Sequence, residues 1–376
     1  MSAPAEPFDV AIVGAGVVGA AVARLLSFHR LRVVLVEGGS DVGAGTSKAN
    51  TAILHTGFDA PPGTVESRLV ARGYQLLRSY APGAGIALEE TGAVLVAWDD
   101  AQAAALGGLA TKARANGYQR AEIVDAATVY DLEPHLAPGA HAGLVIPDEH
   151  IIDPWATPLA FATEAVLNGA ELRRSSPVTA ITAGHDDHQL HTPGGPLRAR
   201  FLVNAAGLHA DELHRRLGHD SFTVTPRRGE LIVFDKLARG LLHRTILPVP
   251  TATTKGVLIA PTVFGNVMLG PTADDIEDKS ATGSTRGGID RLLAQGRRIL
   301  PALIDEEVTA VYAGLRSATE HGDYVIELHA DQRYVCLGGI RSTGLTASMA
   351  VAEEAARLLA DAGLVLEPRP SDELIA

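Results

Sequence analysis

Residues 8–37, FDVAIVGAGVVGAAVARLLSFHRLRVVLVE, contain two apolar runs separated by a glycine-rich turn. The first run, Phe8–Val13, predicts a buried strand, and residues 17–29 after the turn predict a helix. The second run, Leu31–Val36, is apolar except for Arg32 near its start, as is typical of strands inside parallel sheets. This order of strand, helix and strand indicates a βαβ unit at the start of a Rossmann-type domain.

The turn inside this unit has the spacing GxGxxG. Gly14 permits the tight turn, Gly16 lets the backbone approach a pyrophosphate, and Gly19 allows the helix to pack closely on the strand. Glu37 ends the second strand, where an acid accepts hydrogen bonds from ribose hydroxyls and would repel a 2′-phosphate. The unit therefore predicts a site for FAD or NAD, and this segment alone leaves the choice between them open.

Another apolar strand, residues 201–204, ends in the small residues Ala205, Ala206 and Gly207. Small residues at a strand end let the backbone pass close to a cofactor, although an ordinary strand can end in the same way. The remaining helical patterns lie at 64–80, 100–116, 153–168, 288–299 and 346–362. Further strands are expected at 88–98, near 172, and at 178–181, 188–191, 197–204, 223–234, 256–260, 266–269, 308–315, 324–327 and 334–337.

Composition excludes several classes of function. The chain has 376 residues and a net charge of -12, which argues against a nucleic-acid surface because phosphate binding needs net basic character. Its single cysteine, Cys336, excludes intrachain disulfides, cysteine-ligated iron–sulfur clusters and CxxC zinc sites, and its apolar neighbours predict packing in a buried strand. The apolar stretch 10–26 is too short to span a membrane. We expect a soluble cytoplasmic protein, with peripheral membrane association left open.

Several further segments together carry a resemblance to a known family. The segment 46–57, TSKANTAILHTG, resembles the flavin-facing loop of the D-amino-acid-oxidase superfamily of FAD-dependent oxidoreductases. Within that superfamily the chain is most similar to the short glycerol-3-phosphate oxidases and dehydrogenases, and next to the L-2-hydroxyglutarate dehydrogenases. Thr51 and Ala52 depart mildly from the Ser-Gly that is common there. Matching segments along nearly the whole chain are 228–229, 255–257, 270–273, 314–316, 338–342 and 344–346.

The resemblance implies noncovalently bound FAD and an α/β fold in which a Rossmann-type FAD-binding domain is interleaved with a mixed-sheet α+β substrate domain. The expected FAD-binding domain comprises residues 1–80, 150–215 and 330–376, and the expected substrate domain comprises 81–149 and 216–329. The cofactor-binding residues expected from the motif and the resemblance are Gly14, Gly16, Val17, Val18, Gly19, Glu37, Gly38, Thr46, Ser47, Asn50, Thr51, Val178, Ala206, Gly207, Gly339, Gly344, Leu345 and Thr346.

The resemblance also places candidate catalytic residues. His55 occupies the position of a base beside the flavin, and an imidazole suits removal of a hydroxyl proton near neutral pH. Lys255 and Arg316 are expected to act with it by holding an anionic substrate group. Arg341 and Ser342 are weaker candidates for the same anion pocket. A solvated strand end for Lys255 and a structural ion pair for Arg316 are the competing interpretations.

No metal site is expected from the sequence. Glu320, His321 and Asp323 form a short polar cluster, and residues 274–278 form an acidic run. Both segments are interpreted as exposed loops in preference to metal or calcium sites.

Together with these residues, the resemblance implies FAD-dependent oxidation of a small anionic secondary alcohol by hydride transfer to flavin N5, with glycerol 3-phosphate or a related polyol phosphate as the leading substrate. An L-2-hydroxy acid such as 2-hydroxyglutarate is the alternative, and oxidation of an amine or amino acid comes third. The alternative to an enzyme is a redox-inactive subunit that binds FAD and leaves the chemistry to a partner. The electron acceptor is left open between O₂, a quinone and a partner protein.

Overall fold

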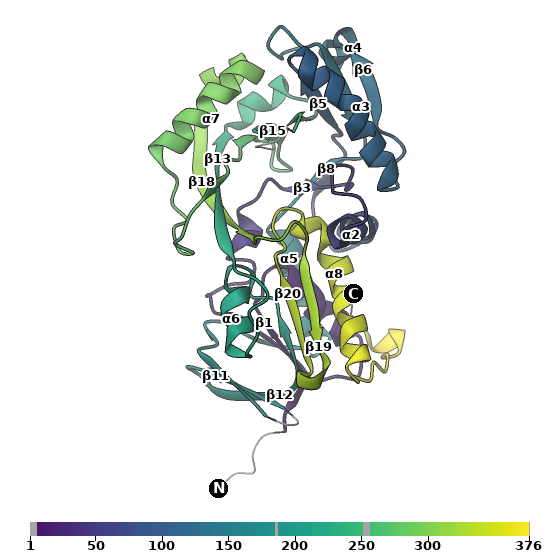
Figure 1. The fold of residues 1–376 in the computed structure, drawn as a ribbon, viewed down its shortest axis with the longest axis vertical. Helices are drawn as coiled ribbons and strands as arrows, with labels where there is room; N and C mark the ends of the chain where they lie inside the picture. Colours follow the sequence, from purple (N-terminus) through teal and green to yellow (C-terminus); the bar gives the residue numbers. More distant parts are fainter. Residues whose placement is uncertain (1–5, 185–186, 251–255, 376) are drawn as a thin grey trace. The chain divides into compact units, whose positions relative to one another are not determined.

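The computed structural model describes residues 6–184, 187–250 and 256–375, and the chain divides into two compact units (Figure 1). Unit 1 comprises Met1–Lys48, Pro154–Pro226 and Arg316–Ala376, and unit 2 comprises Ala49–Asp153 and Arg227–Leu315. Each unit is therefore assembled from segments that are distant in the sequence.

Unit 1 is built on a sheet whose central strands are all parallel, in the order β9-β2-β1-β12-β20. A β10–β11 hairpin continues the sheet antiparallel to β12, and β19 pairs antiparallel with β20. The strands are β1 (Phe8–Val13), β2 (Val33–Val36), β9 (Glu171–Arg173), β10 (Ala180–Ala183), β11 (His188–Thr192), β12 (Gly195–Asn204), β19 (Val325–His329) and β20 (Tyr334–Gly338).

Helix α1 (Val17–Ser27) packs against both α5 (Ala156–Leu167) and α8 (Gly344–Asp361). Its buried face is built from small residues, including Gly19 and Ala20, which permit this close packing. A short helix, α6 (Ala210–Arg216), packs on β20. The 3₁₀ turns of this unit are η1 (Thr46–Lys48), η2 (Gly207–His209), η5 (Ala330–Gln332) and η6 (Ser371–Glu373).

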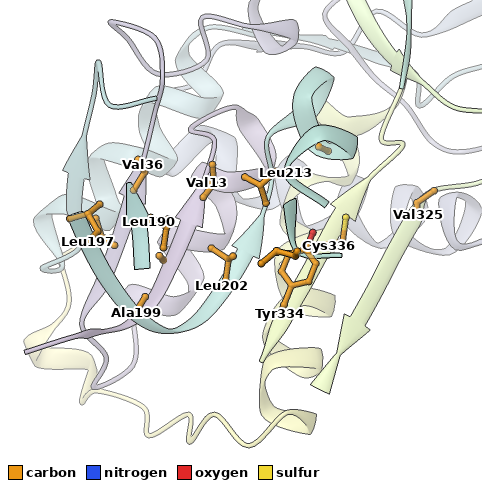
Figure 2. Packing of buried hydrophobic residues seen from close by; sticks show 14 of the residues in the cluster. Val13, Val36, Leu190, Leu197, Ala199, Leu202, Leu213, Val325, Tyr334 and Cys336 are labelled. Atoms are coloured by element: carbon orange, nitrogen blue, oxygen red, sulfur yellow. The ribbon is translucent and has the colours of Figure 1, made fainter. Parts of the chain in front are cut away.

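The core of unit 1 lies between these parallel strands and α6 (Figure 2). Val13, Leu202 and Leu213 are among its buried side chains, and Tyr334 and Cys336 project from β20 into the same cluster. The packing role expected for Cys336 is confirmed. Burial raises the pKa of its thiol to about 12, so this cysteine stays protonated and unreactive at neutral pH.

Unit 2 contains a nine-stranded mixed sheet in the order β17-β13-β16-β15-β14-β5-β7-β6, with β18 paired to β13. Strands β5 and β14 are parallel, whereas the pairs β5–β7 and β15–β16 are antiparallel. The mixed α/β architecture expected from the sequence is thus confirmed. The strands are β5 (Ala93–Ala97), β6 (Glu122–Asp125), β7 (Ala142–Ile146), β13 (Thr225–Phe234), β14 (Thr245–Pro248), β15 (Leu258–Pro261), β16 (Val267–Gly270), β17 (Asp274–Asp275) and β18 (Val308–Ala318).

The helices of unit 2 begin at polar caps. The side chains of Thr64, Asp99 and Thr285 each accept a hydrogen bond from a backbone N–H in the first turn of the helix that follows. These helices are α2 (Val65–Gly83), α3 (Asp100–Ala115) and α7 (Arg286–Ile299), and α4 (Ala126–Leu132) is capped in the same way; the 3₁₀ turns are η3 (Lys236–Leu241) and η4 (Pro301–Asp305).

A separate three-stranded sheet in unit 2 consists of β3 (Ile53–Leu54), β8 (His150–Ile152) and β4 (Leu88–Glu89). Residues 49–80, expected in the first domain, group with unit 2 because β3 pairs with β8 there. The single strand expected at 88–98 is two strands, since Gly92 between them adopts a φ of 68°. Across the described ranges, no helix is both long and apolar enough to cross a membrane.

Candidate cofactor and catalytic sites

The carboxyl ends of four parallel strands of unit 1 lie in register. Val13 of β1 pairs with Val36 of β2 and with Asn204 of β12, and Asn204 pairs in turn with Cys336 of β20. Ligands of open parallel sheets bind beyond this edge, where the loops after the strands meet. The candidate cofactor residues at 14–19, 37–38, 206–207 and 339 all follow these strand ends.

Two glycines at the junction of β1 and α1 leave no room for a side chain. Gly14 adopts a φ of 103°, and a Cβ atom placed there would lie 2.4 Å from the carbonyl oxygen of Ala205. A Cβ atom on Gly19 would lie 1.9 Å from the carbonyl oxygen of Gly14. Two of the three motif glycines are therefore required by contacts within unit 1, as the sequence motif predicts.

Helix α1 leaves its N-terminus available to a ligand. Its N-cap residue is Gly16, which makes no side-chain capping hydrogen bond. The backbone N–H of Val17 donates to Ser47 Oγ at 2.9 Å, which brings a second candidate segment to the helix end. Unsatisfied N–H groups and the positive end of the helix dipole favour a phosphate at such a position. Residues 16–19 and Ser47 thus fit the pyrophosphate of a dinucleotide.

Glu37 is fixed beside the glycine turn. Its Oε2 accepts a hydrogen bond from the N–H of Ala15 at 2.7 Å, and its Oε1 accepts one from Gly39 at 2.7 Å. A carboxylate oxygen has two lone pairs, so each oxygen can still accept a ribose hydroxyl. Val178, expected near an adenine, is half-buried against the core cluster of unit 1. Its adenine contact stays a prediction.

A second helix N-terminus of unit 1 lacks a side-chain cap. Helix α8 follows Thr343, whose Oγ1 hydrogen-bonds Tyr324 OH at 2.5 Å and does not cap the helix. Leu345 and Thr346 in the first turn are buried. Helices α1 and α8 pack together, and both lack a side-chain cap, as do α5 and α6 among the described helices of unit 1. This pattern fits a ligand with one anionic group at α1 and a second electron-rich edge at α8, as FAD has.

The base candidate of unit 2, His55, has a buried acidic partner. The antiparallel pairing of β3 with β8 places residue 55 beside residue 149. His55 Nδ1 lies 3.0 Å from Glu149 Oε2, while Glu149 Oε1 accepts hydrogen bonds from the N–H of Thr56 at 2.6 Å and from Thr56 Oγ1 at 2.8 Å. Glu149 is only 1% exposed, whereas the His55 side chain is 22% exposed.

The contact with Glu149 favours one tautomer of the neutral His55 imidazole. With Nδ1–H donating to the carboxylate, the lone pair of the neutral ring resides on Nε2, which is then the basic nitrogen. The adjacent negative charge also stabilises the imidazolium that forms when Nε2 accepts a proton. The pair is therefore chemically equipped to act as a general base. Sequence reasoning missed Glu149, because 94 positions separate it from His55 and no local pattern joins them.

The loop before His55 is held within unit 2. Asn50 Oδ1 accepts a hydrogen bond from the N–H of Ala52 at 2.7 Å, and Ala52 adopts a φ of 55°. This left-handed conformation explains why glycine is common at the position in the resembling family. A Cβ atom on Gly314 of β18 would lie 2.0 Å from the carbonyl oxygen of Ala49. The loop that carries Asn50 and Thr51 therefore lies directly on β18.

Three of the four anion-binding candidates, Arg316, Arg341 and Ser342, lie on described segments of unit 1. Arg316 is half-buried on β18. Ser317 Oγ donates to the carbonyl oxygen of Ile340 at 3.1 Å, so the segments of Arg316 and Arg341 are neighbours in unit 1. Arg341 Nη2 donates to the carbonyl oxygen of Gly322 at 2.8 Å, which gives it a structural role. Ser342 is exposed, and Lys255 lies outside the described residues.

The two polar segments interpreted as loops make structural contacts. Glu320 accepts hydrogen bonds from the N–H of Thr223, and His321 Nε2 hydrogen-bonds the carbonyl oxygen of Ser221 at 2.9 Å. In the acidic run, Asp275 forms an ion pair with Arg227 at 2.6 Å. Glu320 and His321 thus anchor their loop to residues 221–223, whereas Asp275, expected in a loop, lies in the short strand β17 beside Arg227 of β13.

Comparison with known proteins gives a consistent picture. Residues 9–358 match the DAO family, described as FAD dependent oxidoreductase. The chain is 34% identical to glycerol 3-phosphate dehydrogenase of Caloramator mitchellensis, over 92% of this chain and 72% of that protein. It is similar to the solved structure of dithionite-reduced L-alpha-glycerophosphate oxidase from Mycoplasma pneumoniae with FAD bound, with a TM-score of 0.91 and 31% identity over 98% of this chain and 97% of that one. It is also 29% identical to L-2-hydroxyglutarate dehydrogenase of Caenorhabditis elegans, over 71% of this chain and 63% of that protein.

Proposed function

Because the chain belongs to the DAO family of FAD-dependent oxidoreductases, we propose that it oxidises the secondary alcohol of glycerol 3-phosphate or a closely related polyol phosphate. The observation that carries this proposal is the contact between the partly exposed His55 and the buried Glu149, which makes the imidazole a base suited to an alcohol. Relatives named for glycerol 3-phosphate, at 34% and 32% identity, support the choice of substrate. An L-2-hydroxy acid is the second candidate, supported by the L-2-hydroxyglutarate dehydrogenases among the relatives.

In this proposal His55 Nε2 takes the proton of the substrate hydroxyl, and the Glu149 carboxylate stabilises the resulting imidazolium. Bound FAD supplies the acceptor for the hydride that leaves the same carbon. Proton and hydride together account for the two hydrogens lost when the alcohol becomes a ketone. Arg316 and Lys255 hold the anionic end of the substrate, since a guanidinium binds a phosphate or a carboxylate in a bidentate manner.

Unit 1 is proposed to bind FAD noncovalently. The N-terminus of α1 with Ser47 would hold the pyrophosphate, Glu37 the ribose, and the N-terminus of α8 the electron-rich edge of the isoalloxazine. The close fit of Gly14 and Gly19 in the turn after β1 and the hydrogen bond from the N–H of Val17 to Ser47 Oγ support this assignment. The contacts of the remaining candidate cofactor residues with FAD stay predictions.

The test is anaerobic reduction of the purified yellow protein. We expect glycerol 3-phosphate to bleach the flavin absorbance at lower concentration and faster than L-2-hydroxyglutarate does. Bleaching by L-2-hydroxyglutarate alone would favour the second candidate, and bleaching only by an amino acid would overturn alcohol oxidation. A protein that binds FAD but is reduced by no substrate would have a redox-inactive role.

The same experiment can be extended to identify the electron acceptor. Admitting air to the reduced protein distinguishes O₂ from other acceptors by the rate at which the yellow colour returns. If reoxidation by air is slow, a quinone analogue and a partner protein are the acceptors to test next. We propose a cytoplasmic location, which suits a chain with one buried, free cysteine.

A further inference from the structure

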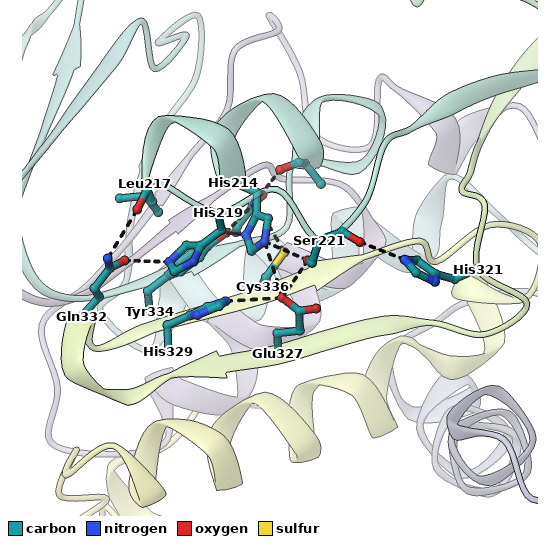
Figure 3. Close-up of polar contacts among 12 residues, drawn as sticks. His214, Leu217, His219, Ser221, His321, Glu327, His329, Gln332, Tyr334 and Cys336 are labelled. Atoms are coloured by element: carbon teal, nitrogen blue, oxygen red, sulfur yellow. Dashed lines mark hydrogen bonds and ion pairs between the residues drawn. The ribbon is translucent and has the colours of Figure 1, made fainter.

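A group of histidines in unit 1 lies where α6 faces β19 (Figure 3). His214 projects from α6, and Glu327 and His329 project from β19. Their ligand atoms all lie within 4.8 Å of one another. We propose that His214, Glu327 and His329 form a binding site for a divalent transition-metal ion, for which zinc is the natural occupant.

The spacing of the donor atoms suits tetrahedral zinc. Glu327 Oε2 lies 3.4 Å from His214 Nε2 and 3.3 Å from His329 Nε2. Bonds of about 2.0–2.2 Å in a tetrahedral site place neighbouring ligand atoms roughly 3.3–3.6 Å apart. Ser221 Oγ lies 3.0 Å from both His214 Nε2 and Glu327 Oε2, so it can orient a water molecule in the fourth position.

The cluster contains an imidazole nitrogen whose hydrogen bonding is incomplete. His329 Nε2 is shielded from solvent and makes no hydrogen bond within the described ranges, although Glu327 Oε2 is only 3.3 Å away. A buried polar atom of this kind normally has a partner, because leaving it unpaired costs free energy. A metal ion bound by both residues would satisfy the nitrogen and the carboxylate together.

The chemistry of the donor atoms also indicates which ion the site would bind. Two imidazoles and one carboxylate favour zinc over magnesium or calcium, which prefer all-oxygen ligands.

Surrounding side chains hold the rings in place. His214 Nδ1 lies 3.1 Å from Tyr334 OH, which accepts a hydrogen bond from Asn204 Nδ2 at 3.0 Å. The ring of His329 stacks on that of His219, with ring centres 3.6 Å apart. Such outer contacts fix the tautomer and orientation of metal-binding histidines. The metal would link α6 to β19 and so stabilise unit 1.

The test uses the FAD-loaded protein after removal of metal with EDTA and dialysis. Calorimetric titration with ZnCl₂ should show one ion bound per chain, and the thermal midpoint should rise with zinc. Co²⁺ offers a second probe, because a tetrahedral site gives intense absorption at longer wavelengths than the flavin bands.

The variants Glu327→Gln and His329→Gln should weaken zinc binding more than about tenfold, since each removes a direct ligand. His141→Gln is the matched control, because it removes the histidine of an exposed pair with Asp100 in unit 2 and should leave zinc binding unchanged. FAD content and metal-free thermal midpoint show whether each variant folds. Zinc uptake that is absent, or equally strong in the folded Glu327→Gln and His329→Gln variants, would overturn the proposal; neither result depends on turnover.

Discussion

At the scale of single residues, the contact between His55 and Glu149 leads us to expect that replacing His55 lowers kcat. His55 Nε2 is the proposed proton acceptor, and its Nδ1 contacts Glu149 of unit 2, whereas FAD is proposed to bind to unit 1. Replacement of His55 by alanine should therefore leave FAD bound and lower kcat by at least about a hundredfold, the usual contribution of a general base. Anaerobic flavin reduction measured by stopped flow checks this. Near-normal reduction would remove His55 from the mechanism.

Glu149→Gln tests the orientation of the same imidazole. The N–H of Thr56 holds the amide oxygen on its side, so the new NH₂ group faces His55 Nδ1. The ring must then carry its proton on Nε2, which cannot accept the substrate proton. We expect kcat to fall by about a hundredfold or more while FAD content is unchanged.

The matched control is Asp100→Asn, which alters an exposed histidine–carboxylate pair with His141 in the same unit. This variant should keep wild-type kcat. Equal losses in Asp100→Asn and Glu149→Gln would mean that the effect is not specific to His55.

The two members of this pair differed in how far the sequence could reveal them. His55 is placed by the segment it belongs to, which resembles a flavin-facing loop. Glu149 could not be found, because only the pairing of two very short strands, β3 and β8, brings it to His55. Strands of two and three residues are too short to show the alternation from which strands are predicted.

At the scale of elements, we expect that a substitution in the tightly packed junction of β1 and α1 causes loss of the cofactor. Gly19→Ala places a methyl group against the carbonyl oxygen of Gly14, and the helix must move to relieve the contact. We expect a loss of FAD, measured as flavin absorbance per chain, and a decrease of about 1–3 kcal/mol in the free energy of unfolding. Gly107→Ala is the control, because it lies on the exposed face of α3 where an added Cβ meets no atom within 4 Å. It should retain FAD and stability.

Periodic elements were predictable from the sequence, and irregular ones were not. The strands β1 and β2 and the helices α1, α3 and α8 lie where their apolar patterns place them. The prediction of a single strand at 88–98 was wrong, because Gly92 interrupts the region with a positive φ. Short elements such as α6 have too few residues to show a pattern, although α6 contributes His214 to the histidine cluster.

At the scale of the whole molecule, buried histidines predict how stability depends on pH. His150 and His188 are each 2% exposed, and burial lowers the pKa of both rings below the ordinary value. The unfolded chain therefore binds more protons than the folded chain below about pH 6.5. Their contribution is present in full above that pH and is lost as the pH falls toward the lower folded pKa values.

We accordingly expect the free energy of unfolding, measured by urea titration in EDTA, to decrease from pH 7 to pH 5. A variant carrying His150→Gln and His188→Gln should show a shallower decrease, because amides do not titrate. An unchanged slope would show that other groups dominate. The exposed substitution His209→Gln should leave the slope as in the wild type.

The interleaving of two domains was predictable from parallel units at both ends of the sequence, but the crossing points were not. They depend on which distant segments pair, as β3 and β8 do in unit 2. The assignment of unit 1 to FAD and of unit 2 to substrate stays a prediction.

The position of α1 between α5 and α8 constrains how the chain is made on the ribosome. Helix α1 emerges early, yet α8, which covers part of it, is translated more than three hundred residues later. At roughly 5–20 residues per second, this helix waits about 15–60 seconds for its last neighbour. During that interval the nascent chain exposes apolar surface, so its yield in cells should depend on chaperones and on translation speed.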